Sequence, residues 1–525
     1  MSYRYLLHAA IFENAQKIPE HPAVRFQKEE LTYLQLAKAS NQLANFLISH
    51  GVKRGDRVGI YMNKNLYSAV SIYGILSAGA AYVPLDPFAP IDRLSFVIND
   101  CQIQFIITND QKMENVKEII SKTSLQGLIG VQDNPEIDVP SFSWEQICSF
   151  PSSSPPIQLV EQDLAYILYT SGSTGTPKGI MHTHRSGLSF AEWAAKTYQI
   201  SSTDRISNHT PLHFDLSTFD FFASAIGGAT TVIVPQGITK LPASMSKWIQ
   251  DEKITIWYSV PFALIQMLER GNLESRNLSN LRWILFAGEP FPTKHLRTLM
   301  KTLPWVKFSN LYGPTETNVC TYYHVTPLSE DSDDPIPIGI VCENTEDLVV
   351  NNEGRPVEEG EVGELLIRGG TVMKGYWGRP DMTDKGFYRR KMFEYCEDIF
   401  YRTGDLVKKM PDGNYKFLGR KDRQIKTRGY RVELDEVEAA LLSHSAIHEA
   451  AAYPVPDVEG SNLIEAAVIL IEGESIGEDD IIKHLSGRLP GYAIPTKIII
   501  SDDFPRTSTG KINRRELQER ATRRI

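Results

Sequence analysis

Helical and strand patterns alternate along most of the first half of the sequence, and this alternation limits the folds available to it. Residues 31–51 place apolar side chains at helical spacing and end at Gly51, a residue type that commonly follows a helix. A buried-strand pattern follows at 55–62, and a second helical pattern at 68–79. Further strand patterns occur between helical stretches at 104–108, 127–131, 230–235 and 282–288. Such alternation favours an α/β architecture with largely parallel sheets.

The pattern changes after about residue 345. Residues 346–369 have the features of short strands joined by turns, which predicts a small β-rich subdomain. Residues 413–444 run from a strand through a turn to an amphipathic helix, and the last hundred residues are long enough for a small α+β unit. The sequence therefore predicts several structural units rather than one uniform domain.

Composition excludes several classes of protein. Hydrophobic residues make up 42% and charged residues 23%, which is typical of a folded chain and not of a disordered one. The net charge of −9 argues against a nucleic-acid binder, and five widely spaced cysteines without a CxxC pair argue against a disulfide framework or a zinc site. The start of the chain does not resemble a secretory signal, and the uncharged stretch 65–85 has the pattern of a buried helix and strand rather than a membrane span. We expect a cytoplasmic protein with no membrane or nucleic-acid partner.

Residues 166–180, YILYTSGSTGTPKGI, are the densest local signal in the sequence. A strand-like run leads into several hydroxyl residues, three glycines whose backbone can approach a ligand, and Lys178, a combination that suits a polyphosphate. The run is not a P-loop, because Pro177 and Gly179 flank the lysine where that motif needs a glycine and a hydroxyl residue. Without further motifs, the alternative is a flexible surface loop.

This run resembles the phosphate loop of adenylate-forming enzymes, the superfamily of acyl-CoA synthetases, luciferases and the adenylation domains of nonribosomal peptide synthesis. The other motifs that carry the resemblance stand in the family's order over nearly the whole chain: LSAGAAYVPLDP (76–87), FDLS (214–217), NLYGPTET (310–317), GELLIRGGTVMKGYWGRPDMT (363–383), YRTGDL (401–406), GRKDRQIKTRGYRVELDEVE (419–438), LPGYAIPTK (489–497) and PRTSTGKINRREL (505–517). The resemblance implies an α/β fold with a large N-terminal domain of two α/β subdomains and a small β-barrel-like subdomain. A small, mobile α+β C-terminal domain follows.

The implied domains are an adenylation core at 1–421, which binds ATP and the amino acid, and a mobile unit at 422–525 that pivots at Asp422. The implied reaction has two steps. A carboxylate attacks the α-phosphate of ATP to give an acyl-adenylate and pyrophosphate, and a thiol then displaces AMP to give a thioester. Neither step needs a protein nucleophile, so we expect catalysis by positioning and charge stabilisation.

The resemblance also implies roles for individual residues. The ATP-binding set is Thr170, Ser171, Gly172, Ser173, Thr174, Gly175 and Lys178 for the phosphates, Gly288, Glu289, Pro290, Asn310 and Tyr312 for adenine, and Asp405 and Arg420 for the ribose. Thr315 is expected at the α-phosphate, and Glu316 is expected to help hold Mg²⁺, a cation that prefers oxygen ligands. Taken alone, Asp405 would be an ordinary turn residue and Tyr312 a core residue.

Lys511, in an STGK turn, resembles the family's catalytic lysine, which would neutralise charge as the adenylate forms. The alternative is a surface lysine in a basic tail, because the residues from Pro505 onward carry seven Lys or Arg and two acidic residues. The KTRGYR loop around Gly429 is expected to replace Lys511 at the site when the C-terminal domain pivots for thioester formation.

Asp215, in FDLS, matches the aspartate that binds the α-ammonium in family members that activate amino acids. A carboxylate in a substrate cleft without an opposing cation would be costly to bury, and a substrate ammonium supplies that cation. The alternative is a helix N-cap, because a helix pattern starts here. On such a helix Asp215 and Phe219 would face the same way. The implied pocket is Asp215, Leu216, Phe219, Tyr258, Leu285, Ala287, Leu311, Val319 and Cys320, with Lys511 for the substrate carboxylate.

This pocket set resembles that of freestanding L-prolyl-AMP ligases, which load proline onto a carrier protein in pyrrole or anatoxin-type pathways. We expect L-proline as substrate and, since only fourteen residues follow Lys511, a carrier protein in trans whose phosphopantetheine thiol accepts the prolyl group. The alternatives are another small apolar amino acid, as in D-alanyl–carrier-protein ligases, an acyl- or aryl-CoA ligase on the same fold, and a non-catalytic nucleotide-binding protein. Asp215 argues against the CoA ligase, and the presence of Lys511, Glu316 and Asp405 argues against the non-catalytic protein.

Overall fold

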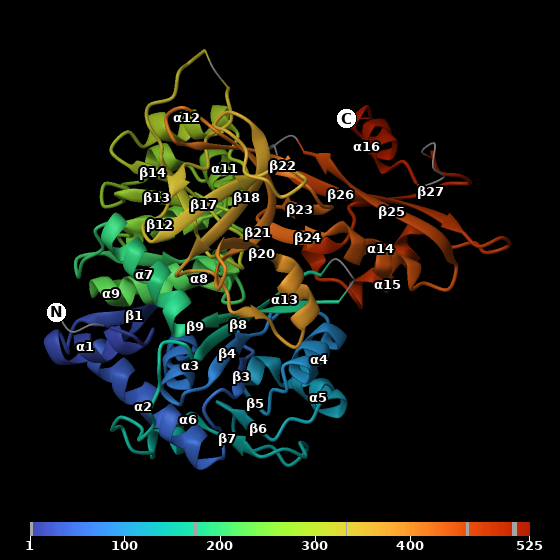
Figure 1. Ribbon diagram of the computed structural model, residues 1–525. Helices are drawn as coiled ribbons and strands as arrows, with labels where there is room; N and C mark the ends of the chain where they lie inside the picture. Colours follow the sequence, from blue (N-terminus) through green and yellow to red (C-terminus); the bar gives the residue numbers. More distant parts are fainter. Residues whose placement is uncertain (1–3, 173–175, 332, 458–460, 507–511, 525) are drawn as a thin grey trace.

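Figure 1 shows the computed structural model of the chain, which describes residues 4–172, 176–331, 333–457, 461–506 and 512–524. Two large sheets with helices packed against them make up the body of the molecule, and the orange-to-red C-terminal segment forms a separate lobe at one side. The predicted α/β fold, with its large N-terminal part and small C-terminal part, is confirmed.

A nine-stranded sheet forms one half of the body. Its strands, in spatial order, are β16 (Ile340–Val341), β15 (Thr321–His324), β14 (Lys307–Tyr312), β13 (Trp283–Ala287), β12 (Ile256–Ser259), β10 (Arg205–Asn208), β11 (Thr230–Ile233), β1 (Pro22–Phe26) and β2 (Glu29–Thr32). The central strands are parallel, β2 pairs antiparallel at one edge, and β15 and β16 pair antiparallel at the other. The helices in this half are α1 (Ala9–Lys17), α7 (His184–Thr197), α8 (Leu216–Thr218), α9 (Ser224–Gly227), α10 (Pro242–Asp251), α11 (Pro261–Arg270) and α12 (Thr293–Thr302).

An eight-stranded sheet forms the other half. Its strands, in spatial order, are β19 (Gly375–Tyr376), β9 (Lys178–Thr183), β8 (Leu164–Thr170), β4 (Ala81–Pro84), β3 (Arg57–Ile60), β5 (Phe105–Ile107), β6 (Gly127–Ile129) and β7 (Ser141–Phe142). The strands from β8 to β7 are parallel, whereas β9 pairs antiparallel with both β8 and β19. Its helices are α2 (Tyr33–Ser49), α3 (Leu66–Ser77), α4 (Ile91–Asp100), α5 (Met113–Lys122) and α6 (Trp144–Cys148).

Local sequence signals set the first helix boundaries of this half. Helix α2 starts at a capping box formed by Thr32 and Gln35, and the chain turns at Gly51, whose φ is +91°. Asn65 caps α3 by accepting a hydrogen bond from the Tyr67 amide. The uncharged stretch 65–85 is therefore α3 followed by strand β4, as predicted. No helix within the described ranges is long and apolar enough to cross a membrane.

A five-stranded antiparallel sheet forms the β-rich subdomain predicted after residue 345. It contains β17 (Thr345–Val350), β18 (Val362–Gly369), β20 (Phe387–Phe393), β21 (Cys396–Lys409) and β22 (Tyr415–Arg420), with helix α13 (Pro380–Gly386) before β20.

Within the residues that the structure describes, the C-terminal lobe combines a β-hairpin with a three-stranded sheet and three α-helices. Its elements are β23 (Gln424–Thr427), β24 (Tyr430–Glu433), α14 (Leu434–Leu442), β25 (Ile447–Pro456), β26 (Asn462–Leu470), α15 (Glu478–Ser486), β27 (Lys497–Ile500) and α16 (Arg514–Thr522). Two apolar clusters fill this lobe and draw on residues 425–521 alone, whereas the other clusters lie between residues 7 and 417. The domain boundary at 421/422 remains a prediction with which this separation of cores agrees.

Candidate active site

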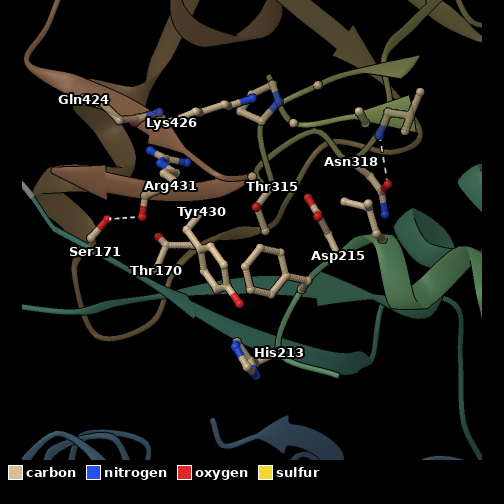
Figure 2. A pocket seen from close by; sticks show the side chains of 18 of the residues that line it. Thr170, Ser171, His213, Asp215, Thr315, Asn318, Gln424, Lys426, Tyr430 and Arg431 are labelled. Atoms are coloured by element: carbon tan, nitrogen blue, oxygen red, sulfur yellow. Dashed lines mark hydrogen bonds between the residues drawn. The ribbon is translucent and has the colours of Figure 1, made fainter. Parts of the chain in front are cut away.

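One pocket lies where the two halves of the body meet the C-terminal lobe (Figure 2). The body lines it with the end of β8, the loop before α8 and the ends of β12, β13 and β14. The hairpin β23–β24 and Tyr492 line it from the C-terminal lobe. Parallel strands that end together bring side chains from distant parts of the sequence to one place, which is where α/β proteins commonly bind ligands.

The glycine-rich run connects β8 to β9, as a strand-to-loop pattern predicts. Thr170 and Ser171 line the pocket. A Cβ on Gly172 would lie 2.0 Å from the carbonyl oxygen of Thr176, so the backbone here leaves no space for a side chain. Ser173, Thr174 and Gly175, which we predicted to bind phosphate, lie outside the described residues. Lys511 also lies outside them, so its predicted role remains an expectation.

Glu316 is fully buried and is surrounded by cationic and hydroxyl donors. Its Oε2 accepts a hydrogen bond from Arg431 Nη1 at 2.7 Å, and its Oε1 lies 2.8 Å from the Tyr376 hydroxyl and 3.4 Å from Lys178 Nζ. Burial alone would raise the pKa of Glu316, but the charges of Arg431 and Lys178 outweigh it and hold the pKa well below its usual range. Glu316 is therefore ionised in the folded protein at neutral pH.

Asp405 and Arg420 face each other across the pair of strands β21 and β22. Arg420 Nη1 donates to Asp405 Oδ1 at 2.6 Å, while its Nε and Nη2 hold both oxygens of Asp422 at 2.7 and 2.6 Å. The Tyr312 hydroxyl donates to the other oxygen of Asp405. Burial raises the pKa of Asp405 despite the nearby charge of Arg420. One hydrogen-bonded chain thus joins Tyr312 of the predicted adenine set, the two predicted ribose residues and the predicted hinge residue Asp422.

The predicted adenine turn also contacts the C-terminal lobe. Gly288 lines the pocket with a φ of +101°. The Glu289 carboxylate accepts hydrogen bonds from the amides of Phe262 and Gly429 and from the Ser461 hydroxyl. Glu289 therefore connects the body to the C-terminal lobe, a contact that the motif alone does not predict. The two remaining residues of the predicted adenine set are Pro290, which is exposed, and Asn310, whose amide donates to the carbonyl of Pro337.

Asp215 lies in the pocket wall, immediately before α8. Among the described residues its side chain makes no hydrogen bond that caps this helix, which argues against the N-cap alternative. Burial raises the pKa of Asp215 and outweighs the opposing effects of the Thr315 hydroxyl and the Lys426 ammonium. This carboxylate would be stabilised by a cationic ligand.

The predicted amino-acid pocket is only partly brought together. Leu216, Tyr258, Ala287 and Val319 line the pocket with Asp215. The other four predicted residues are buried in the apolar core and do not line it: Phe219, Leu285, Leu311 and Cys320. Residues 219–223 form a π-helical turn rather than a continued α-helix. The Phe219 ring packs edge-on against the ring of Tyr258, which lines the pocket, with centroids 5.3 Å apart.

Several residues around the pocket were not in the predicted set. The Tyr430 ring stacks on Tyr492 with a centroid distance of 4.0 Å and meets Phe214 edge-on at 5.0 Å. His213 lies at the foot of the pocket in Figure 2, with its Nε2 3.8 Å from Asp86. Tyr430 belongs to the KTRGYR run, which we predicted at the site for thioester formation without assigning a role to its side chains, and the two strands of this run form the hairpin that lines the pocket.

The fold and pocket define the chain as an α/β enzyme body closed by a small C-terminal lobe, the arrangement of an adenylation domain. The adenylation domain AlmE of Vibrio cholerae, solved in complex with glycyl-adenosine-5'-phosphate, superposes with a TM-score of 0.84 over 100% of this chain and 99% of that chain, at 24% identity. That likeness concerns the fold alone.

The chain belongs to the AMP-binding enzyme family, whose profile matches residues 11–377, and the AMP-binding enzyme C-terminal domain matches residues 436–511. A curated relative from Pseudomonas fluorescens, an L-proline--[L-prolyl-carrier protein] ligase, is 36% identical over 97% of this chain and 98% of its own length. A Streptomyces coelicolor protein with the same name is 36% identical over 93% of this chain and 92% of its own length. The predicted membership of the adenylate-forming superfamily is confirmed.

Proposed function

We propose that the chain activates L-proline with ATP to give prolyl-AMP and pyrophosphate, and then transfers the prolyl group to the phosphopantetheine thiol of a separate carrier protein. The observation that carries the proposal is Asp215, a carboxylate whose pKa is raised by burial, standing in a pocket wall of Leu216, Tyr258, Ala287 and Val319. The two relatives named as L-proline ligases, matched over nearly the full chain, support the same substrate.

In the first step the substrate carboxylate attacks the α-phosphorus of ATP, and pyrophosphate leaves with the bonding electron pair. Thr170, Ser171 and Lys178 would bind the phosphates, and Thr315 would donate to the α-phosphate. Asp405 would accept hydrogen bonds from the ribose hydroxyls, with Arg420 holding its carboxylate. The proposed catalytic Lys511 would offset the charge that develops between the two reactants.

The residues around Glu316 suit a divalent cation. The carboxylate is a hard oxygen donor beside the phosphate loop, and its depressed pKa keeps it ionised. Bound Mg²⁺ would be held by Glu316 together with ATP phosphate oxygens, and it would supply charge neutralisation at the phosphates. In the arrangement described here Arg431 occupies that carboxylate, so a cation would bind after the hairpin has moved.

In the second step the carrier's thiol loses its proton and attacks the prolyl carbonyl carbon, and AMP leaves with the bonding pair. The hairpin around Gly429 lies against the pocket, as we predict for the thioester-forming orientation. Asp422 would act as the hinge that exchanges this hairpin for Lys511. Its pairing with Arg420 fixes it at the junction of β22 and β23.

Proline fits the pocket because it combines a compact apolar ring with a cationic secondary amine. The prolinium nitrogen can pair with Asp215 while the ring contacts the apolar wall. A D-alanine or another small apolar amino acid would use the same carboxylate, and these remain the alternatives. An acyl- or aryl-CoA ligase would leave Asp215 without a cationic partner.

The test is ATP–pyrophosphate exchange with the twenty amino acids and with proline analogues of smaller and larger ring. We expect proline to give the highest exchange, and transfer to a phosphopantetheinylated carrier protein to be detected as a mass increase of one prolyl group. Proline exchange no higher than that with alanine or valine would contradict the substrate. If the chain transfers the prolyl group to free coenzyme A but to none of the carrier proteins tested, the proposed acceptor is wrong.

A further inference from the structure

We propose that Lys64 is a positioning residue for the amino-acid site, because its side chain holds in place the segment 208–220 that carries Asp215. The inference rests on the proposed function and adds to it a residue that does not touch the substrate. Lys64 lies in the eight-stranded half of the body, in the loop between β3 and α3. It therefore connects that half to a segment of the nine-stranded half.

The hydrogen bonds of Lys64 are the first observation. The side chain is buried, and its Nζ donates to the backbone carbonyls of Asn208, His209 and Thr210 at 2.6, 2.8 and 2.8 Å. These three acceptors use all three N–H donors of a protonated lysine. Three consecutive carbonyls, at the end of β10 and in the loop after it, thus point at one nitrogen atom. The start of the segment is thereby fixed relative to the other half of the body.

Asp220, at the far end of the segment, is the second observation. Its side chain is 1% exposed and accepts a hydrogen bond from the side-chain amide of Asn208 at 2.8 Å. Burial raises the pKa of Asp220, and the nearby charge of Lys64 opposes this change. A buried carboxylate needs a cation, and Lys64 supplies it. Both ends of the segment are therefore held by the same buried lysine.

Between these two ends the chain turns tightly and places Asp215 in the pocket wall. The Ser217 hydroxyl donates to the carbonyls of Leu212 and Phe214 at 3.1 and 2.7 Å. Residues 213–216 line the pocket, and Figure 2 shows Asp215 among them. Because these short-range bonds stiffen the loop, a shift at its start would be carried to the Asp215 carboxylate.

Loss of Lys64 should loosen this segment without unfolding it. The Tyr73 hydroxyl of α3 donates to the carbonyl of Phe221 at 2.8 Å, and this bond holds the π-helical turn after the segment independently of Lys64. The predicted phosphate and ribose residues lie near β8, β9, β21 and β22, outside the segment. We therefore expect amino-acid binding to weaken and ATP binding to stay the same.

Steady-state ATP–pyrophosphate exchange by Lys64→Met provides the test. Methionine keeps nearly the length of the side chain but donates no hydrogen bond. The KM for proline should rise about tenfold or more, while the KM for ATP stays within about twofold of that of the unaltered protein. Lys64→Arg keeps the charge and the donors, and should bring the KM for proline back to within about threefold. An unchanged KM for proline in Lys64→Met would overturn the proposal.

Ile119→Ala is the matched control for a loss of stability. Ile119 is fully buried in α5 and belongs to a different apolar cluster from Leu216 and Phe219. The substitution should lower the melting temperature, as Lys64→Met does, and leave the KM for proline unchanged. An equal rise of this KM in both variants would make Lys64 a structural residue and overturn the proposal. A matching rise in the KM for ATP in Lys64→Met would overturn it as well.

Asp220→Asn takes the place of Lys64→Met if that variant does not fold. It removes the charge opposite Lys64 and keeps an oxygen that can accept from Asn208. We expect the KM for proline to rise about threefold, with the KM for ATP unchanged. An unchanged KM for proline in this variant would then overturn the proposal.

The two proposals fail separately. If no amino acid supports exchange by the unaltered protein, the proposed function is wrong and the role of Lys64 falls with it. If another amino acid gives the highest exchange, the proposed substrate is wrong, and the same measurements with that amino acid test Lys64. An unchanged KM in Lys64→Met refutes the role of Lys64 and leaves the substrate assignment standing.

Discussion

Replacing Asp215 with asparagine tests the substrate ammonium site while keeping the shape of the side chain. A carboxylate and an ammonium about 4 Å apart attract by about 4 kcal/mol at an effective dielectric constant of about 20. Desolvation of both groups offsets part of this, so we expect the variant to bind proline about 10²- to 10³-fold more weakly. ATP should bind as before, because the phosphate and ribose residues are unchanged.

The stability of the same variant distinguishes a ligand role from a structural one. Burial raises the pKa of Asp215, so the ionised side chain is unfavourable in the folded protein without substrate. Above the raised pKa the side chain is ionised, and it then lowers the free energy of unfolding. Asp215→Asn should therefore melt at the same temperature or higher at pH 8, measured by calorimetry without ligand. Asp251→Asn, at a carboxylate paired with Lys247 on the surface, is the matched control. A lower melting temperature together with unchanged proline affinity would refute the reasoning.

Three further predictions concern stability, ATP binding and pH. Lys64→Met should lower the free energy of unfolding, measured with urea, by about 3 kcal/mol or more, because the buried side-chain nitrogen of Lys64 donates to three backbone carbonyls. Lys17→Met, at an exposed lysine, is the control. Gly172→Ala should abolish the thermal shift produced by ATP, since a Cβ would clash with Thr176; a normal shift would contradict this. Glu316→Gln should destabilise the protein at pH 7, because the ion pairs of the folded state depress the pKa of Glu316. The loss of stability should become smaller as the pH falls below about 4.5, where glutamate in the unfolded chain becomes protonated. A constant difference across this pH range would count against those pairs.

Short-range patterns predicted much of the architecture. The helix over 31–51 appears as α2, with its capping box at Thr32 and its stop at Gly51, because both signals act within one helical turn. The position of the phosphate loop between two strands was also predictable, since a glycine run after a strand-like segment is a local feature. The steric reason for Gly172 was not, because it depends on how the loop folds back on Thr176.

The amino-acid pocket was harder to predict because it depends on which side chains reach the cavity. The i, i+4 rule places Phe219 on the same side of a helix as Asp215, but it does not say whether both line the pocket. Phe219 is fully buried against the ring of Tyr258, and Tyr258 lines the pocket in its place. Leu285 and Ala287 are two residues apart on β13 and therefore share a face of the sheet, and Leu311 of β14 pairs with Ala287. A motif match gives the strand and the face but not the depth: Ala287, at the end of β13, lines the pocket, whereas Leu285, in the middle of the strand, is buried in the core.

Contacts between the body and the C-terminal lobe depend on how two separately cored units dock, which the sequence leaves open. Glu289 and Glu316 were assigned to ATP and metal, yet both also bind the lobe, through Gly429 and Arg431. In the mechanism we propose, these two uses are compatible because they belong to different steps of one reaction. A carboxylate that holds a metal in one step would need another cation in the next, and Arg431 of the hairpin supplies one in the arrangement described here. The pairing of Glu316 with Arg431 thus agrees with the electrostatic cost of leaving a buried charge unpaired.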